Sequence, residues 1–128
     1  MPPTYRNPKQ IGGIFIAKLI VTEKPSVAMS YAKVLGVHGR QDGYLEGSGY
    51  IVSWCVGHLV ELAPPSAYGE QYVEWSITDL PILPQKWQYL VSASTKKQFS
   101  VLKKLMHRAD VDTCLLYTSD AADDLTRV

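Results

Sequence analysis

The polar run Glu23-Lys24-Pro25-Ser26 follows an apolar, β-branched stretch and carries the most suggestive chemistry in the sequence. A carboxylate at the carboxyl end of a buried strand lies where open α/β sheets place their ligand sites. The helix expected next presents free N–H groups and a partial positive charge, which favour an anion. A proton-transferring glutamate, a lysine beside a phosphate and a helix N-terminus together suit phosphodiester chemistry. The alternative is a solvated turn in which Ser26 only caps the helix.

The elements that must position this run are predicted from apolar periodicity. Residues 17–22 (AKLIVT) are typical of a short buried strand. Ser26 is a suitable helix N-cap, and Gly36 is a suitable last residue of that helix. The inward face is expected to contain Val27, Met29 or Ser30, Tyr31, Val34 and Leu35. A strand, a tight loop and a helix make the first half of a βαβ unit.

Further along the chain, residues 43–47 and 50–56 read as two strands joined by a Gly-Ser-Gly turn. The β-rich pattern continues through residues 57–62 until a Pro-Pro pair interrupts it. Residues 66–85 are then expected to form an ordered segment that is rich in turns. Its aromatic side chains need burial or a ligand. Residues 89–93 read as another strand, and Thr95 caps a helix over residues 96–107. That helix is expected to face inward with Phe99, Leu102 and Leu105 or Met106, and Val111 begins a further strand.

Composition narrows the class of protein. The 128 residues allow one domain or part of one, and 46% hydrophobic with 20% charged residues is ordinary for a globular chain. No apolar run reaches the roughly 18–20 residues that cross a bilayer, so no membrane role is expected. The formal net charge of +1 does not by itself predict a nucleic-acid partner. Cys55 and Cys114 lack metal-ligand spacing, which favours a reduced cytoplasmic protein.

Several ordered motifs resemble the Toprim domain of type IA DNA topoisomerases, and bacterial topoisomerase III in particular. The first is LIVTEKPSVAMSYAKVLG at residues 19–36, followed by GYLEG at 43–47 and YIVSWCVGHLVELAPP at 50–65. Tyr68, Trp75, LPILP at 80–84, STKKQF at 94–99 and ADV at 109–111 extend the match. The resemblance implies an α/β fold: a Rossmann-like, partly parallel sheet with flanking helices and a β-hairpin insertion, truncated at its C-terminus.

The resemblance also implies roles for individual residues. Glu23 matches the Toprim glutamate, which serves proton transfer or metal binding at the scissile phosphate. Lys24 matches the lysine that stabilises the phosphate, and Trp75 and His58 fall where the family touches single-stranded DNA. The alternative for Trp75 is a buried structural role, and the alternative for His58 is a role in packing. The basic helix face that includes Lys96 and Lys97 either attracts the DNA backbone or is merely solvated.

The resemblance weakens near the C-terminus, where the family carries an acidic Mg²⁺ site. Mg²⁺ needs several oxygen ligands in near-octahedral geometry, and the family supplies them from an Asp-x-Asp or Asp-x-Gly core followed by Arg-Glu-Gly-Glu. Ser119 stands where the first of these aspartates is expected, with Asp120 next to it, and the Arg-Glu-Gly-Glu sequence is absent. Asp120 is therefore a weak candidate metal ligand beside Glu23. The nucleophilic tyrosine of the family belongs to a separate domain, and Tyr117 is not assigned that role.

Both ends of the chain look foreign to the middle. Residues 1–16 are expected to be a translated leader or a disordered N-terminal extension, because Gly12-Gly13 can be encoded by a ribosome-binding site. Residues 114–123 read CLLYTSDAAD, which a transposon-derived adapter of sequencing libraries encodes. We therefore expect a partial Toprim domain at residues 17–113 and a non-native tail at residues 114–128. A natural acidic tail is the alternative.

The full-length protein implied by the resemblance is an ATP-independent isomerase of the bacterial cytoplasm, associated with the nucleoid or a plasmid. It would cleave, pass and reseal single-stranded or negatively supercoiled DNA through a 5′-phosphotyrosine link. The present chain is expected to be a monomer and inactive by itself, since it has one catalytic carboxylate and no nucleophile. The alternatives are a non-enzymatic nucleic-acid-binding module with a Toprim-like fold and an inert truncation.

Overall fold

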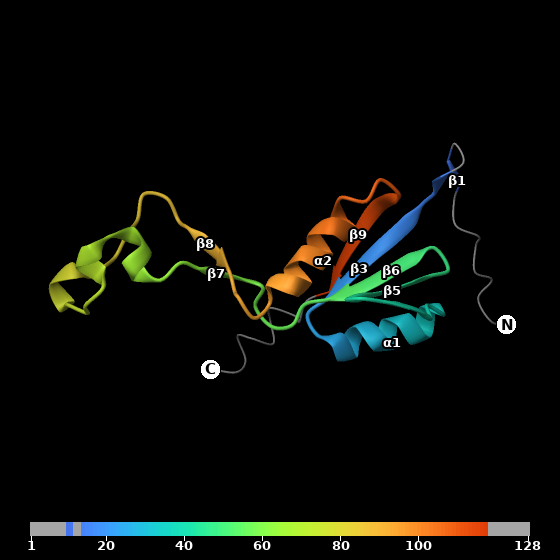
Figure 1. Ribbon diagram of the computed structural model, residues 1–128, viewed down its shortest axis with the longest axis horizontal. Helices are drawn as coiled ribbons and strands as arrows, with labels where there is room; N and C mark the ends of the chain where they lie inside the picture. The colour runs from blue at the N-terminus through green and yellow to red at the C-terminus, as the bar shows by residue number, and fades with distance from the viewer. Residues whose placement is uncertain (1–9, 12–13, 118–128) are drawn as a thin grey trace.

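A computed structural model describes residues 10–11 and 14–117 of the chain. Its main sheet has five strands in the order β4-β5-β6-β3-β9 (Figure 1). These strands are β3 (Ala17–Thr22), β4 (Gly39–Gln41), β5 (Tyr44–Gly47), β6 (Tyr50–Trp54) and β9 (Val111–Tyr117). The two helices are α1 (Pro25–Leu35) and α2 (Lys96–Met106). The short strands β1 (Gln10–Ile11) and β2 (Ile14–Phe15) pair with each other.

Strand β3 lies inside the sheet and runs parallel to both of its neighbours, β6 and β9. Strands β4, β5 and β6 form an antiparallel meander, so the sheet is partly parallel with a hairpin added at one side. Ser48 and Gly49 have φ values of 52° and 79°, the double positive φ of a tight hairpin turn. The α/β fold expected from the resemblance is confirmed.

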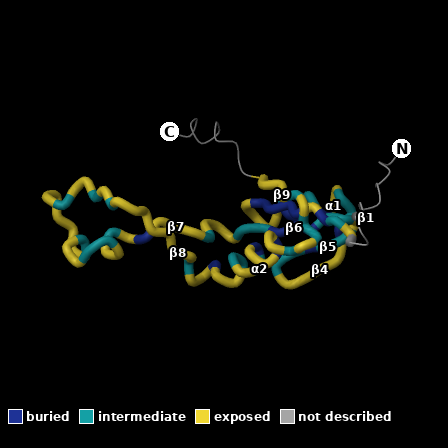
Figure 2. Tube along the Cα trace, turned by 90° about the horizontal axis from the view of Figure 1, so that it is seen from above, coloured by how far each residue is buried: buried dark blue, intermediate teal, exposed yellow. Residues whose placement is uncertain are grey.

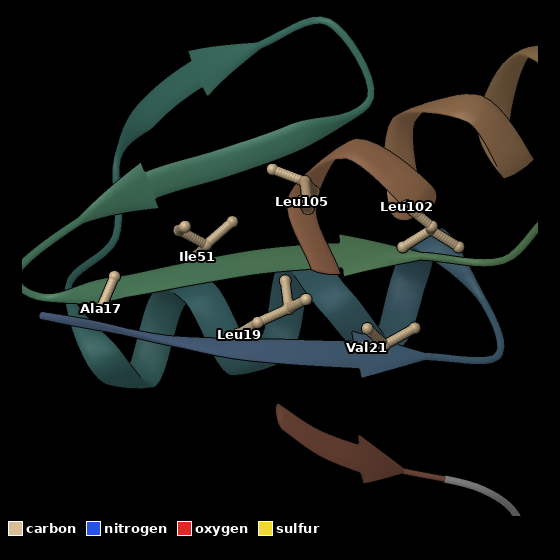
Figure 3. Close-up of a cluster of buried hydrophobic side chains, with 6 residues drawn as sticks. All are labelled: Ala17, Leu19, Val21, Ile51, Leu102 and Leu105. Carbon is tan, nitrogen blue, oxygen red and sulfur yellow. The ribbon is translucent and has the colours of Figure 1, made fainter. Parts of the chain in front are cut away.

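Alternate residues of β3 and β6 are buried on opposite faces of the sheet. Leu19, Val21 and Ile51 pack against Leu102 and Leu105 of α2, and Figure 3 shows these side chains between the helix and the strands. On the other face, Ile20 and Val52 pack against the small residues of α1. Covering both faces explains why β3 reads as a continuous apolar run rather than an alternating one.

Helix α1 begins at Pro25, and Lys24 is its N-cap without a side-chain capping bond. The expectation that Ser26 caps the helix is wrong, because proline is suited to the first helical position and lacks the N–H that a cap would satisfy. The buried residues of α1 are Ala28 and Ala32, whereas Val34, expected inside, is 77% exposed. The helix ends at Gly36, whose φ of 69° is left-handed.

Residues 57–93 leave the sheet as an arm that projects from the body (Figures 1 and 2). Its base is the antiparallel pair β7 (Val60–Leu62) and β8 (Tyr89–Val91), and its outer part holds three 3₁₀ turns. These are η1 (Pro65–Tyr68), η2 (Glu70–Tyr72) and η3 (Ile77–Asp79). The expected strand near residues 89–93 is confirmed. The alternative in which Trp75 is a buried structural residue is wrong, because the residue is 84% exposed.

Strand β9 crosses the predicted domain boundary after Thr113. Residues 113–117 pair with β3 from Lys18 to Thr22. The non-native origin of residues 114–128 stays a prediction, and residues 118–128 lie outside the described part of the chain. In that part, no helix has both the length and the apolar character needed to span a membrane.

Candidate functional site

Three parallel strands end side by side where the polar run begins. Thr22, the last residue of β3, is in register with Trp54 of β6 and Tyr117 of β9. From this edge, α1 covers one face of the sheet and α2 the other. The chain visits these three strands as β3, β6 and β9, whereas their order in the sheet is β6-β3-β9, so the topological switch point at which open α/β sheets bind ligands lies between the carboxyl ends of β3 and β9. Glu23 follows β3 at this edge and is exposed.

Hydrogen bonds fix the backbone on both sides of Glu23. The N–H of Cys55 donates to the carbonyl oxygen of Thr22 at 2.8 Å, which extends the β3–β6 pairing by one step. The Thr22 hydroxyl donates to the carbonyl oxygen of Lys24 at 2.8 Å. The same oxygen accepts from Ala28 N–H at 3.2 Å in the first turn of α1. Glu23 and Lys24 thus stand in a closed turn at the start of the helix.

The Glu23 carboxylate acts electrostatically on the end of β6. Burial raises the pKa of the Cys55 thiol, and the negative charge of Glu23 raises it further. A carboxylate disfavours a thiolate only when the two groups are near each other. Glu23 therefore lies near the end of β6, in agreement with the hydrogen bond from Cys55 N–H to the carbonyl oxygen of Thr22.

The first turn of α2 is attached to the same edge through Gln98. Its side-chain amide lies 2.7 Å from the Trp54 carbonyl oxygen, 3.0 Å from the Gly43 carbonyl oxygen and 3.2 Å from the Ser53 hydroxyl oxygen. Lys96 and Lys97 begin the helix, and both are exposed. Lys97 also forms an exposed ion pair with Asp42, at 3.1 Å between its Nζ and a carboxylate oxygen.

The structure brings Glu23, Lys24 and the start of α2 to one edge, and the two predicted DNA contacts, His58 and Trp75, lie on the segment that follows β6. His58 is exposed in the segment between β6 and β7. Trp75 lies on the arm between η2 and η3. Tyr117, at the end of β9, contacts the ring of Tyr31 with a 5.5 Å centroid distance.

The described residues do not make a magnesium site. They include no group of three or more His, Cys, Asp or Glu side chains placed to hold a metal ion. Glu23 alone does not satisfy an ion that prefers octahedral oxygen coordination. Asp120, the second predicted ligand, lies outside the described residues. The donor set seen here therefore does not fit Mg²⁺.

Three residues at this edge were not identified from sequence as part of the site. Thr22 and Cys55 are the last residue of one strand and the residue after another, and Gln98 stands within the predicted helix. A polar residue that ends an apolar run is the signal that points to Thr22. Gln98 gives no such signal, because its partners lie 44 to 55 residues earlier in the chain.

At the opposite edge of the sheet, Arg108 joins two carboxylates. Its guanidinium donates to both oxygens of Asp110, at 2.6 and 2.9 Å, and to both oxygens of Glu46, at 2.8 and 3.3 Å. The hydrogen bond from Arg108 holds the pKa of the Asp110 carboxyl below its usual range. The backbone carbonyl of Asp110 also accepts from Ala17 N–H at 2.8 Å. This cluster fastens β5 to the start of β3 and β9.

The fold and its polar edge define a doubly wound α/β domain whose carboxyl edge is suited to an anion. Residues 18–122 match the model of the Toprim domain, and the chain belongs to this family. It is 45% identical over 101 residues to a DNA topoisomerase 3 of Shouchella clausii, covering 79% of this chain and 14% of that protein. It is 43% identical over 100 residues to DNA topoisomerase 3 of Bacillus subtilis, covering 78% and 14%. A DNA topoisomerase 3 of Haemophilus influenzae is 47% identical over 95 residues, covering 73% and 15%. The chain therefore spans a small part of the length of these relatives.

Proposed function

We propose that this chain is the Toprim segment of a topoisomerase III-like type IA DNA topoisomerase, and that its carboxyl edge binds the scissile phosphate of single-stranded DNA. The observation that carries the proposal is the position of Glu23, directly after a central parallel strand at the carboxyl edge of the sheet. Lys24 at the cap of α1 and two lysines at the start of α2 supply positive charge at the same edge.

In the proposed reaction, a tyrosine from another part of the full-length enzyme attacks a phosphodiester and forms a 5′-phosphotyrosine link. Another strand passes through the gap, and the released 3′-hydroxyl reseals the break. Glu23 transfers the proton to or from the 3′-oxygen, and Lys24 stabilises the charged phosphate. No nucleotide hydrolysis is required, because the covalent link conserves the energy of the bond.

Mg²⁺ belongs to this proposal only for the full-length enzyme, where it would supply positive charge at the phosphate and position the DNA. Because the described residues do not complete its ligand set, none of the roles given to Glu23 and Lys24 depends on the ion. The present chain, without the nucleophilic tyrosine, is proposed to be inactive. Relaxation of negatively supercoiled plasmid in the presence of Mg²⁺ tests this, and any turnover would contradict it.

DNA binding by the edge is tested with a labelled single-stranded oligonucleotide and fluorescence anisotropy over a range of salt concentrations. Replacing Lys24 and Lys97 by Gln is expected to weaken binding and to reduce the salt slope by about 0.7 for each phosphate that is no longer neutralised. Lys33→Gln is the matched control, because Lys33 is an exposed lysine in the last turn of α1, away from the carboxyl edge. Binding that is absent, or weakened equally in the control, would contradict the proposed site.

Trp75 and His58 are proposed as additional DNA contacts, because an exposed indole offers a face for base stacking. Trp75→Ala is expected to cost about 1–3 kcal/mol of binding free energy if one base stacks on the ring. Ile77→Ala removes a neighbouring side chain that is 90% exposed and serves as the control. Equal affinity of the Trp75 variant and the wild type for the oligonucleotide would show that Trp75 is not part of the DNA site.

The same binding assay separates the two alternatives to an enzyme. Oligonucleotide binding without turnover would favour a non-enzymatic nucleic-acid-binding module over an inert truncation.

A further inference from the structure

Thr22 is a buried polar residue at the centre of the carboxyl edge. Its side chain ends the apolar run of β3, and the residue is only 1% exposed. A buried hydroxyl without a partner is costly, so it constrains the groups around it. Here its partner is the backbone of Lys24, two residues further along the chain.

The hydrogen bond of Thr22 spans Glu23. Its hydroxyl donates to the Lys24 carbonyl oxygen at 2.8 Å, while its own carbonyl accepts from Cys55 N–H at 2.8 Å. The first bond closes the turn around Glu23, and the second ties that turn to the end of β6. The conformation of the glutamate backbone is therefore held by its neighbours and not by contacts of its own side chain.

We propose that Thr22 is a positioning residue: its hydroxyl closes the Thr22–Lys24 turn and so holds Glu23 beside Cys55 at the end of β6. The importance of this position for catalysis rests on the proposed function, but the placement itself does not. A purely structural role would require only a β-branched side chain that fills the same volume. Valine meets that requirement and lacks the hydroxyl.

Cys55 can serve as a probe of the glutamate, because it follows β6 and its N–H is bonded to the carbonyl oxygen of Thr22, the residue before Glu23. A carboxylate near the thiolate repels the anionic reagent iodoacetate and leaves neutral iodoacetamide unaffected. The ratio of the two alkylation rates therefore reports the local charge and cancels most effects of exposure and thiol ionisation. Cys114 on β9 supplies the internal control, since burial alone raises the pKa of its thiol. Peptide mass spectrometry separates the two cysteines.

The experiment compares the full chain with Glu23→Gln, Thr22→Val and Thr22→Ser at one alkaline pH. Removing the charge in Glu23→Gln is expected to lower the iodoacetamide-to-iodoacetate ratio at Cys55 by about twofold, the size of an interaction between partly exposed charges. Thr22→Val is expected to lower the ratio to the same value although Glu23 is present. Thr22→Ser, which keeps the hydroxyl, is expected to retain the wild-type ratio, and Cys114 is expected to stay constant throughout.

A wild-type ratio in Thr22→Val, or an unchanged ratio in Glu23→Gln, would overturn the proposal. Circular dichroism checks whether each variant is folded, and Thr22→Ala is a second hydroxyl-free variant should the valine disturb packing. No DNA is present in this experiment. If the chain does not bind the oligonucleotide but the alkylation ratios change as expected, only the proposed function is contradicted. If the ratio at Cys55 is unchanged in Thr22→Val, the role of Thr22 is contradicted.

Discussion

The sheet body and the arm both contain large apolar side chains, but the body buries them and the arm leaves them exposed. Ile51 in β6 is fully buried between the sheet and α2, whereas Ile77 in η3 is 90% exposed. Among the residues of the arm, all of which the structure describes, Ala63 alone is buried. Burial in the body depends on a helix covering each face of the sheet. The arm is a two-stranded ribbon with short turns, and a ribbon has no second layer to cover its side chains.

The arm maintains its form through local polar contacts instead. The Tyr68 hydroxyl accepts from Gln88 N–H at 2.9 Å, and the ring of Tyr68 meets that of Trp87 edge-on at 6.3 Å. Ser76 accepts from Thr78 N–H at the start of η3. These contacts order the chain but leave most of its large apolar side chains exposed, so they bury little of the surface that stabilises a fold.

Charge separates the two regions as well. The arm holds Glu61, Glu70, Glu74 and Asp79 against one lysine, Lys86, which gives a formal charge of −3. Helix α2 of the body holds four lysines and no acidic residue. The proposed phosphate site therefore lies on the body, next to the positively charged helix α2, and not on the acidic arm. The arm offers exposed rings, which suit base stacking more than phosphate contact.

The largest expected effect is that of replacing Ile51, the buried one of the two isoleucines compared above. Ile51→Ala removes methyl and methylene groups from the centre of the core and is expected to lower the free energy of unfolding by about 2–5 kcal/mol. Urea denaturation followed by circular dichroism measures this change. A loss below about 0.5 kcal/mol would show that the body is not the stabilising unit of the molecule.

An intermediate effect is expected from the ion cluster at the amino edge of the sheet. Arg108→Ala leaves Glu46 and Asp110 without their shared partner and is expected to cost about 1–2 kcal/mol at neutral pH. The value lies below that of a deeply buried pair because 29% of the Arg108 side chain is exposed. Urea denaturation at pH 7 checks it, and a cost no larger than that of Lys97→Ala would contradict it.

The same cluster gives a pH dependence with a definite sign. The folded-state pKa of Asp110 is lowered by Arg108, so its contribution to stability is present above the unfolded value of about 4. That contribution is lost as the pH falls through the folded-state pKa. The difference in unfolding free energy between wild type and Arg108→Ala should therefore shrink below about pH 4. An equal difference at pH 7 and pH 3 would exclude this coupling.

The smallest effect is expected on the arm. Ile77→Ala makes the same substitution as in the core but at an exposed position, so the free energy of unfolding should change by no more than about 0.5 kcal/mol. Side-by-side urea denaturation of the two alanine variants gives the comparison directly. A cost for Ile77→Ala approaching that for Ile51→Ala would mean that the tip of the arm is covered in solution.

Much of the local structure could be predicted from sequence, because local preferences and tertiary packing agree there. The strand at residues 17–22, the hairpin turn through Ser48 and Gly49 and the end of α1 at Gly36 were all expected from short-range patterns. The predicted N-cap of α1, Ser26, was wrong by two positions, since proline and serine are both good N-terminal residues and the observed cap is Lys24. The buried face of α1 was also partly wrong, because alanines carry little periodic signal yet allow the helix to approach the sheet closely.

The order of amino acids is enough to specify which segments become strands and helices, and it puts Glu23 and Lys24 directly after the first central strand. What surrounds these two residues depends on the folded arrangement. The contact of Gln98 with the end of β6 and the pairing of Glu46 with Arg108 join residues that are 44 and 62 positions apart. Such contacts depend on which strands become neighbours and on the face that each helix covers. Short-range preferences contain no information on either, because those arrangements are set by burying the whole apolar surface at once.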